Sequence, residues 1–176
     1  MEPRSAREAW RGRYLTVVVE SWPEGEFEVI RKHDAVAVVP MTPSGDVVLV
    51  RQFRPPVRTS LLEIPAGLLD VDGEDALTCA VRELREETGY DHTEIGFLAG
   101  AYLSPGFTAE YIHIFWARTT ETPATDAEAG IEVVRMPLGA AIDAARAGRF
   151  RNATTALGLL LAATAPALRD AAMPSS

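Results

Sequence analysis

Cysteine is almost absent from this sequence. Cys79 is the only one, which excludes an intrachain disulfide and is typical of proteins that fold in a reducing compartment. Long hydrophobic runs are also lacking. The chain begins with polar and charged residues rather than the apolar segment of a signal peptide, and its most hydrophobic stretch, residues 156–168, is too short to span a bilayer and contains a proline. We therefore expect a cytoplasmic protein with no membrane partner.

The sequence also has fewer basic than acidic residues. Lysine and arginine number 17 against 25 acidic residues, and the net charge is −8. Binding along a nucleic-acid backbone needs a basic face, so we expect no nucleic-acid partner. A nucleotide-sized anion would need local arginines or metal ions to offset the acidic charge. With 176 residues and 47% hydrophobic content, the chain is long enough to bury the core of one compact domain.

Strand patterns dominate the first two thirds of the chain, with one helical pattern in the middle and two more near the end. This order predicts an α/β (α+β) fold, a mixed sheet with helices packed on its faces. The expected strands are two hairpins (13–22 with 26–33, and 35–54), an extended segment at 61–67, and strands at 94–103, 110–120 and 131–137; the expected helices are 75–88, 138–150 and 152–172.

The middle helix carries an unusual concentration of acid. Glu83, Glu86 and Glu87 are related as i, i+3 and i+4, so they project from one side of the helix, and Gly89 suits its C-terminal cap. Such a face is either a solvated surface or a site for a hard cation, since Mg²⁺ and Mn²⁺ prefer several carboxylate oxygens. The opposite, apolar stripe is expected to pack on the sheet; its members are Leu77, Ala80, Val81, Leu84 and Thr88.

The residues around this helix resemble the Nudix box. That pattern is Gly, five residues, Glu, seven residues, then Arg-Glu-aliphatic-any-Glu-Glu-any-Gly-aliphatic. This chain has Gly67, Glu74, the run R-E-L-R-E-E-T-G at 82–89 and then Tyr90. One departure is visible, since six residues rather than five separate Gly67 from Glu74. The extra residue falls in the loop before the helix, where insertions are tolerated.

The resemblance implies a Nudix-type α/β/α sandwich with a mixed β-sheet and an N-terminal β-hairpin region. It also implies Mg²⁺ as cofactor, with Mn²⁺ as a substitute. Glu83, Glu86 and Glu87 would coordinate the ions with the main-chain carbonyl of Ala66. Arg82 would hold carboxylates in place by charge-assisted hydrogen bonds, with Glu74 as its partner.

Two flanking segments are similar to those of ADP-ribose pyrophosphatases within this family. One is "LVRQFRPPVRTSLLEIPAG" at 49–67, and the other is "SPGFTAE" at 104–110, where Pro105 lies sixteen positions after Gly89. The implied reaction is hydrolysis of the small molecule ADP-ribose to AMP and ribose 5-phosphate. Hydrolysis of another nucleoside diphosphate sugar or of a dinucleotide is the alternative. A nucleotide-sensing domain without catalysis is disfavoured because all three box glutamates are present.

Five residues are candidates for substrate contacts, and four of them have a plainer alternative. Arg51 and Arg54 lie on the strand before the box, where Arg54 meets a phosphate or forms a surface ion pair. Glu110 contacts the terminal ribose or an ion, or is a strand-end charge. Ser104 hydrogen-bonds the ligand or shapes the turn before Pro105. Tyr14 stacks on adenine, or is a core or interface aromatic.

The resemblance implies a catalytic base on the loop after the strand at 110–120, and Glu128 is the candidate there, with a box glutamate as its rival. The resemblance also implies a homodimer in which N-terminal strands are exchanged between subunits and help to hold adenine. We thus divide the chain into an N-terminal strand region, 1–38, a Nudix hydrolase domain, 39–170, and a flexible tail, 171–176.

Overall fold

A computed structural model describes residues 1–165 and residue 168. The tail predicted at 171–176 lies outside the described residues, as does most of the predicted helix beyond 165.

The centre of the molecule is β4 (Ala35–Met41), which is buried along its whole length. It pairs in parallel with β9 (Tyr111–Thr119), and on its other side it pairs antiparallel with β7 (Ala66–Leu68) and, at Met41, with β5. The sheet order is β10-β5-β4-β9-β8, with β6 on β5 and β7 on β4. The remaining strands of this mixed sheet are β5 (Asp46–Arg54), β6 (Thr59–Glu63), β8 (His92–Tyr102) and β10 (Glu132–Pro137), and a 3₁₀ turn, η1 (Pro55–Val57), joins β5 to β6.

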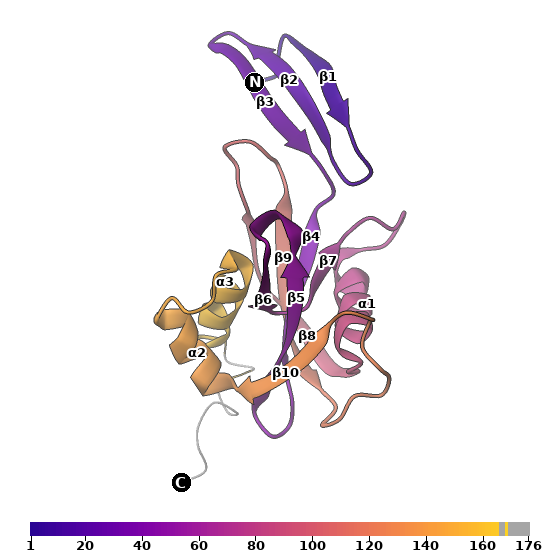
Figure 1. Cartoon of the computed structure of the whole chain (residues 1–176), viewed down its shortest axis with the longest axis vertical. Helices are drawn as coiled ribbons and strands as arrows, with labels where there is room; N and C mark the ends of the chain where they lie inside the picture. Colours follow the sequence, from indigo (N-terminus) through magenta and orange to yellow (C-terminus); the bar gives the residue numbers. More distant parts are fainter. Residues whose placement is uncertain (166–167, 169–176) are drawn as a thin grey trace.

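Alternate side chains of β4 enter two separate cores. Val36 and Val38 pack with Leu84 of α1 (Ala76–Thr88), whereas Val39 packs with Leu159 of α3 (Ala153–Ala162) and with α2 (Leu138–Arg146). Because successive side chains of a strand point to opposite faces, a strand covered on both sides becomes continuously apolar. Figure 1 shows α1 on one side of the sheet and α2 with α3 on the other. The α/β/α prediction is therefore confirmed.

The N-terminal region forms a sheet of its own at one end of the molecule (Figure 1). It consists of β1 (Ser5–Arg11), β2 (Thr16–Trp22) and β3 (Gly25–Arg31), all antiparallel. The predicted hairpin is present as β2 and β3, whereas β1 was missed. All seven residues of β1 are exposed, so the strand has no buried face to produce an alternating apolar pattern.

The ends of α1 follow from local chemistry. Asp75 caps the N-terminus by accepting a hydrogen bond from the Thr78 N–H at 2.7 Å, and Gly89 ends the helix in the left-handed conformation, with φ of 75°. The predicted boundaries are therefore confirmed. The prediction for Leu77 is wrong, because its side chain is 45% exposed. The fully buried face of α1 begins at Cys79, and the first helical turn packs on the core through the partly buried Ala76 rather than through Leu77.

Among the described residues, no helix combines the length and apolar character needed to cross a membrane.

Candidate active site

Arg82 connects three of the acidic side chains around α1. Its Nε and Nη2 atoms donate to the two oxygens of Glu74, both at 2.9 Å. Its Nη1 donates to Glu83 at 2.6 Å and to Glu86 at 3.0 Å. The bidentate bond lowers the pKa of Glu74, and the same contacts raise the pKa of Arg82. One guanidinium therefore offsets the mutual repulsion of this carboxylate face.

Glu87 lies deeper than its two neighbours, and only 6% of it is exposed. One carboxylate oxygen accepts a hydrogen bond from the Ala66 N–H of β7 at 2.9 Å. Burial raises the pKa of Glu87 to about 7; the Ala66 N–H and Arg54 oppose this shift, whereas Glu83 and Glu128 add to it. Burial likewise raises the pKa of Glu83. Negative charge on this face is therefore costly unless further positive charge arrives.

Gly67 allows β7 to approach α1 closely. A Cβ atom at this position would lie 2.0 Å from Glu83 Cδ, well inside contact distance. The extra residue between Gly67 and Glu74 is absorbed by the loop, where Gly73 adopts φ of 79° and the Glu74 N–H donates to the Val71 carbonyl at 3.1 Å. Both ends of the box therefore keep their contacts, Gly67 with Glu83 and Glu74 with Arg82.

The donor set fits a hard divalent cation. The carboxylates of Glu83, Glu86 and Glu87 project from one side of α1, close to the backbone of Ala66. Carboxylate and carbonyl oxygens are the ligands that Mg²⁺ and Mn²⁺ prefer. Within residues 1–165 and 168, no group of three Asp, Glu, His or Cys side chains already converges as a ligand set. Two of the three carboxylates point to Arg82 instead. Glu83, Glu86 and Glu87 are the residues that would hold an ion.

A cavity of about 230 Å³ is lined by β7, and the Ala66 N–H of this strand also donates to Glu87 of α1. Two ion pairs border it. Arg54 contacts Glu63 at 2.6 Å, and Lys32 contacts Glu110 at 2.6 Å. Asn152, at the start of α3, donates to the other oxygen of Glu63 at 2.9 Å. The cavity therefore offers both signs of charge next to the carboxylates of α1.

The structure brings only some of the predicted substrate residues to this cavity. Arg54 and Glu110 line it. Arg51 instead pairs with Glu132 of β10 at 3.0 Å. Tyr14 is 58% exposed between β1 and β2, with the Arg13 guanidinium 5.0 Å from its ring centroid. Ser104 shapes the turn at 104–108, since its carbonyl accepts hydrogen bonds from two following N–H groups.

Glu128 is exposed on the loop between β9 and β10, and that loop is fastened to α1. Its own N–H donates to the Glu86 carbonyl at 2.8 Å, and the Ala124 N–H donates to the Gly89 carbonyl at 2.8 Å. A Cβ on Gly89 would lie 2.0 Å from the Thr125 carbonyl oxygen, so this glycine also permits the close approach. The loop thus holds Glu128 next to the end of α1 that carries Glu86 and Gly89.

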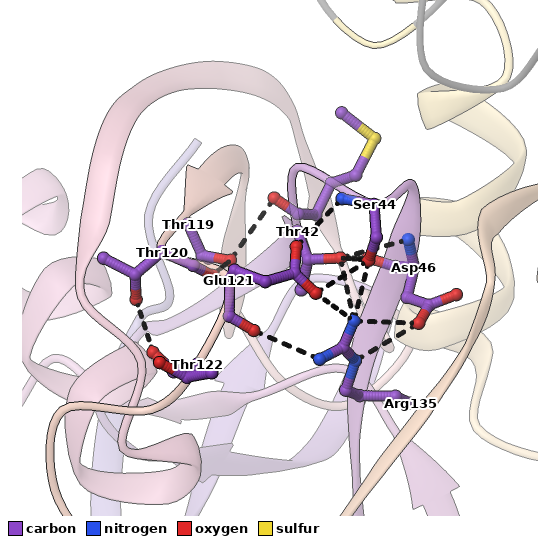
Figure 2. A network of polar contacts seen from close by, with 9 residues as sticks. Thr42, Ser44, Asp46, Thr119, Thr120, Glu121, Thr122 and Arg135 are labelled. Atoms are coloured by element: carbon purple, nitrogen blue, oxygen red, sulfur yellow. Dashed lines mark hydrogen bonds and ion pairs between the residues drawn. The ribbon is translucent and has the colours of Figure 1, made fainter.

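The other end of this loop is fixed by Arg135 of β10 (Figure 2). Its Nη2 donates to Glu121 and to Ser44, both at 2.7 Å, and to Asp46 at 3.0 Å. Glu121 in turn accepts from the Ser44 N–H at 3.0 Å, and hydrogen bonds from Arg135 and Ser44 lower its pKa. The network joins the start of the Glu128 loop to the turn between β4 and β5.

Sequence reasoning missed three residues of the cavity, Lys32, Glu63 and Asn152. Glu63 stands inside the recognised "LLEIPAG" segment without a role having been assigned to it. Asn152 immediately precedes an apolar helix, which is a signal for an N-cap but not for a side chain at a binding site. Lys32 had no signal of its own, because its partner Glu110 is 78 positions away.

Comparison with known proteins identifies the family. The profile of the NUDIX domain matches residues 31–156. An ADP-ribose pyrophosphatase from Bacillus subtilis is 33% identical over 157 residues, 84% of each chain. A GDP-mannose pyrophosphatase from Salmonella arizonae is 38% identical over 122 residues, 63% of each chain.

A solved structure, described as an ADP compounds hydrolase, matches this chain over 92% of each chain, with a TM-score of 0.76 and 24% identity. At this identity the match is evidence for the fold alone. The strands, the two-sided helical cover and the carboxylate face of α1 agree with the family match. The chain therefore belongs to the Nudix hydrolase family.

Proposed function

We propose that this Nudix hydrolase is a Mg²⁺-dependent pyrophosphohydrolase that cleaves ADP-ribose to AMP and ribose 5-phosphate. The observation that carries the proposal is the carboxylate face of α1. Arg82 donates hydrogen bonds to Glu83 and Glu86 there, and the Ala66 N–H of β7 donates to Glu87. The flanking segments at 49–67 and 104–110 favour ADP-ribose. The single cysteine favours a cytoplasmic location.

In this reaction a water oxygen forms a bond to one phosphorus as the P–O bond of the diphosphate bridge breaks. Glu83, Glu86 and Glu87 would hold a divalent ion, which would neutralise the charge of the diphosphate and make the attacking water more acidic. Arg54 offers a cation to the diphosphate from the adjoining cavity. Glu128 takes the proton of the attacking water, since its loop is fastened to the Glu86 carbonyl and its charge acts on Glu87.

A second substrate class is a GDP-linked sugar. The GDP-mannose pyrophosphatase of Salmonella arizonae resembles this chain over a shorter span than the ADP-ribose pyrophosphatase of Bacillus subtilis does. Both substrates share a diphosphate joined to a nucleoside and a sugar, and the box residues serve either. Discrimination therefore lies with the residues that surround the base and the second sugar.

The homodimer is part of the same proposal. The N-terminal sheet carries large exposed side chains, Trp10 at 56%, Tyr14 at 58% and Phe27 at 50%. Phe27 also lines a hollow of about 550 Å³ with Tyr102 and Phe107. Exposed apolar surface of this kind marks interaction sites in soluble proteins. Light scattering coupled to size-exclusion chromatography should give twice the 19.1 kDa chain mass.

A substrate panel tests the proposed activity. We expect kcat/KM for ADP-ribose, with Mg²⁺ present, to exceed that for GDP-mannose, other ADP- and GDP-sugars, diadenosine polyphosphates and nucleoside triphosphates. A preference of tenfold or more for another compound would replace ADP-ribose as the substrate. Full activity in the presence of a chelator would contradict the metal-dependent mechanism.

A further inference from the structure

Glu63 is a carboxylate held from two sides at the edge of the cavity. Only 2% of it is exposed, and each of its oxygens has a partner. Arg54 donates to Oε2 from Nε at 3.0 Å and from Nη2 at 2.6 Å. Asn152 donates from Nδ2 to Oε1 at 2.9 Å. A buried carboxylate must keep such partners, because an unpaired charge in this position is strongly unfavourable.

Asn152 uses both ends of its amide. Its Oδ1 accepts from the Thr155 N–H at 2.9 Å and so caps α3, which leaves Nδ2 to face Glu63. Next to this contact, the Ile64 N–H donates to Thr155 Oγ1 at 3.1 Å. The start of α3 is therefore bonded to Glu63, the last residue of β6, and to Ile64, which directly follows it. Because the cap fixes which amide atom faces Glu63, the carboxylate receives a donor in a defined direction.

Arg54 depends on Glu63 for its own position. It is the last residue of β5, directly before the η1 turn, and 39% of its side chain is exposed. Glu63 is its ion-pair partner among the described residues. An arginine side chain has many rotamers, and two hydrogen bonds to one oxygen of a fixed carboxylate reduce them before any ligand arrives. Both residues line the cavity, as does Asn152.

We infer that Asn152 is a positioning residue, which orients Glu63 so that Glu63 presents the Arg54 guanidinium to the diphosphate of the substrate. We call the series of contacts from Asn152 through Glu63 to Arg54 the relay. The identity of the ligand rests on the proposed function, whereas the relay rests on hydrogen bonds alone. It assigns to α3, far from the Nudix box in sequence, a part in substrate binding. The plainer alternative is that Asn152 only caps α3.

Two substitutions separate the relay from the cap. Asn152→Ser keeps a hydroxyl that caps a helix about as well as asparagine does, but it removes the amide donor to Glu63. Asn152→Ala removes both. The relay predicts that KM for ADP-ribose rises about tenfold in both variants, with kcat within about threefold of wild type. Tm should fall in both variants, because both leave an oxygen of the buried Glu63 without its donor, and it should fall further in Asn152→Ala, which also loses the cap. A role in capping alone predicts a wild-type KM in Asn152→Ser, which would overturn the inference.

Arg54→Ala provides the coupling test. If Asn152 acts through Arg54, Asn152→Ser adds nothing to KM in the Arg54→Ala background, whereas independent effects multiply. Multiplication of the two effects would contradict the relay.

A last readout does not depend on activity. Asn152 is the only asparagine in the chain, so selective ¹⁵N-asparagine labelling gives a single side-chain NH₂ pair. We expect this pair to be protected from solvent exchange in the wild type and to shift in Arg54→Ala. An unprotected pair that Arg54→Ala leaves unchanged would overturn the relay. If the wild type hydrolyses no panel substrate, the proposed function fails while this spectrum still decides the relay.

Discussion

Gly67→Ala is the perturbation whose size the structure defines best. The added Cβ would lie 2.0 Å from Glu83 Cδ, and 2.2 and 2.3 Å from its two oxygens. Ordinary contact begins near 3.4 Å, so the carboxylate must move by about 1.4 Å, the difference between 3.4 and 2.0 Å. A displacement of about 1 Å in a reacting group costs on the order of 100-fold in rate. We therefore expect kcat/KM for ADP-ribose to fall about 100-fold.

Stability should change little in the same variant. The atoms that the new methyl meets belong to the end of a flexible side chain, and alanine restricts the unfolded chain more than glycine does. We expect the free energy of unfolding to change by less than about 1 kcal/mol. The assay is ADP-ribose hydrolysis over a range of Mg²⁺ concentrations, with urea unfolding of the same samples.

Gly139→Ala is the matched control, because a Cβ at Gly139 of α2 meets no atom within 4 Å. We expect it to keep wild-type kinetics and equal or greater stability, since alanine favours helix over glycine. Wild-type kcat/KM in Gly67→Ala would refute the claim that the placement of Glu83 is set by the bare backbone at this glycine. A loss of activity that merely follows unfolding would refute it as well.

Three further perturbations test other parts of the site. Arg82→Lys keeps the charge but cannot bridge three carboxylates, so kcat/KM should fall at least about tenfold; wild-type kinetics would contradict the bridging role. Arg135→Ala should speed amide hydrogen exchange at 120–128. Because the pKa of Glu121 is lowered in the folded protein, the Arg135–Glu121 pair stabilises the fold fully above the ordinary glutamate pKa of about 4.5, so the loss of stability in Arg135→Ala should shrink as the pH falls below that value. A loss of stability that stays constant with pH would contradict this. The Cys79 thiol is buried and has its pKa raised to about 12, so iodoacetamide should label it only in denaturant, and labelling of the native protein would contradict its burial.

Much of the fold could be predicted because its signals are local. The boundaries of α1 follow from Asp75 and Gly89, and the continuous apolar run of β4 follows from its burial on both faces. Other features have no local signal. β1 has no buried face, and Leu77 fits the helical period yet is exposed, because Ala76 is the residue of that turn that packs on the core.

The candidate site divides in the same way. Glu83, Glu86 and Glu87 could be found because one helix presents them together. The contact between Glu63 and Asn152 joins residues 89 positions apart, so no pattern within a segment reveals it. Arg51 was a reasonable candidate from its strand, but its partner on β10 depends on the pairing of β10 with β5. Tertiary pairing therefore decides which charges on a strand face the cavity.

The central claim is that the carboxylate face of α1 performs Mg²⁺-dependent hydrolysis of a nucleoside diphosphate sugar. Glu86→Gln tests it most directly, because Glu86 is 53% exposed and the isosteric amide leaves the core untouched. The measurement is kcat for ADP-ribose at saturating Mg²⁺, with Tm of the same protein. We expect kcat to fall at least about 100-fold with Tm unchanged. Wild-type turnover by a folded Glu86→Gln protein would contradict it.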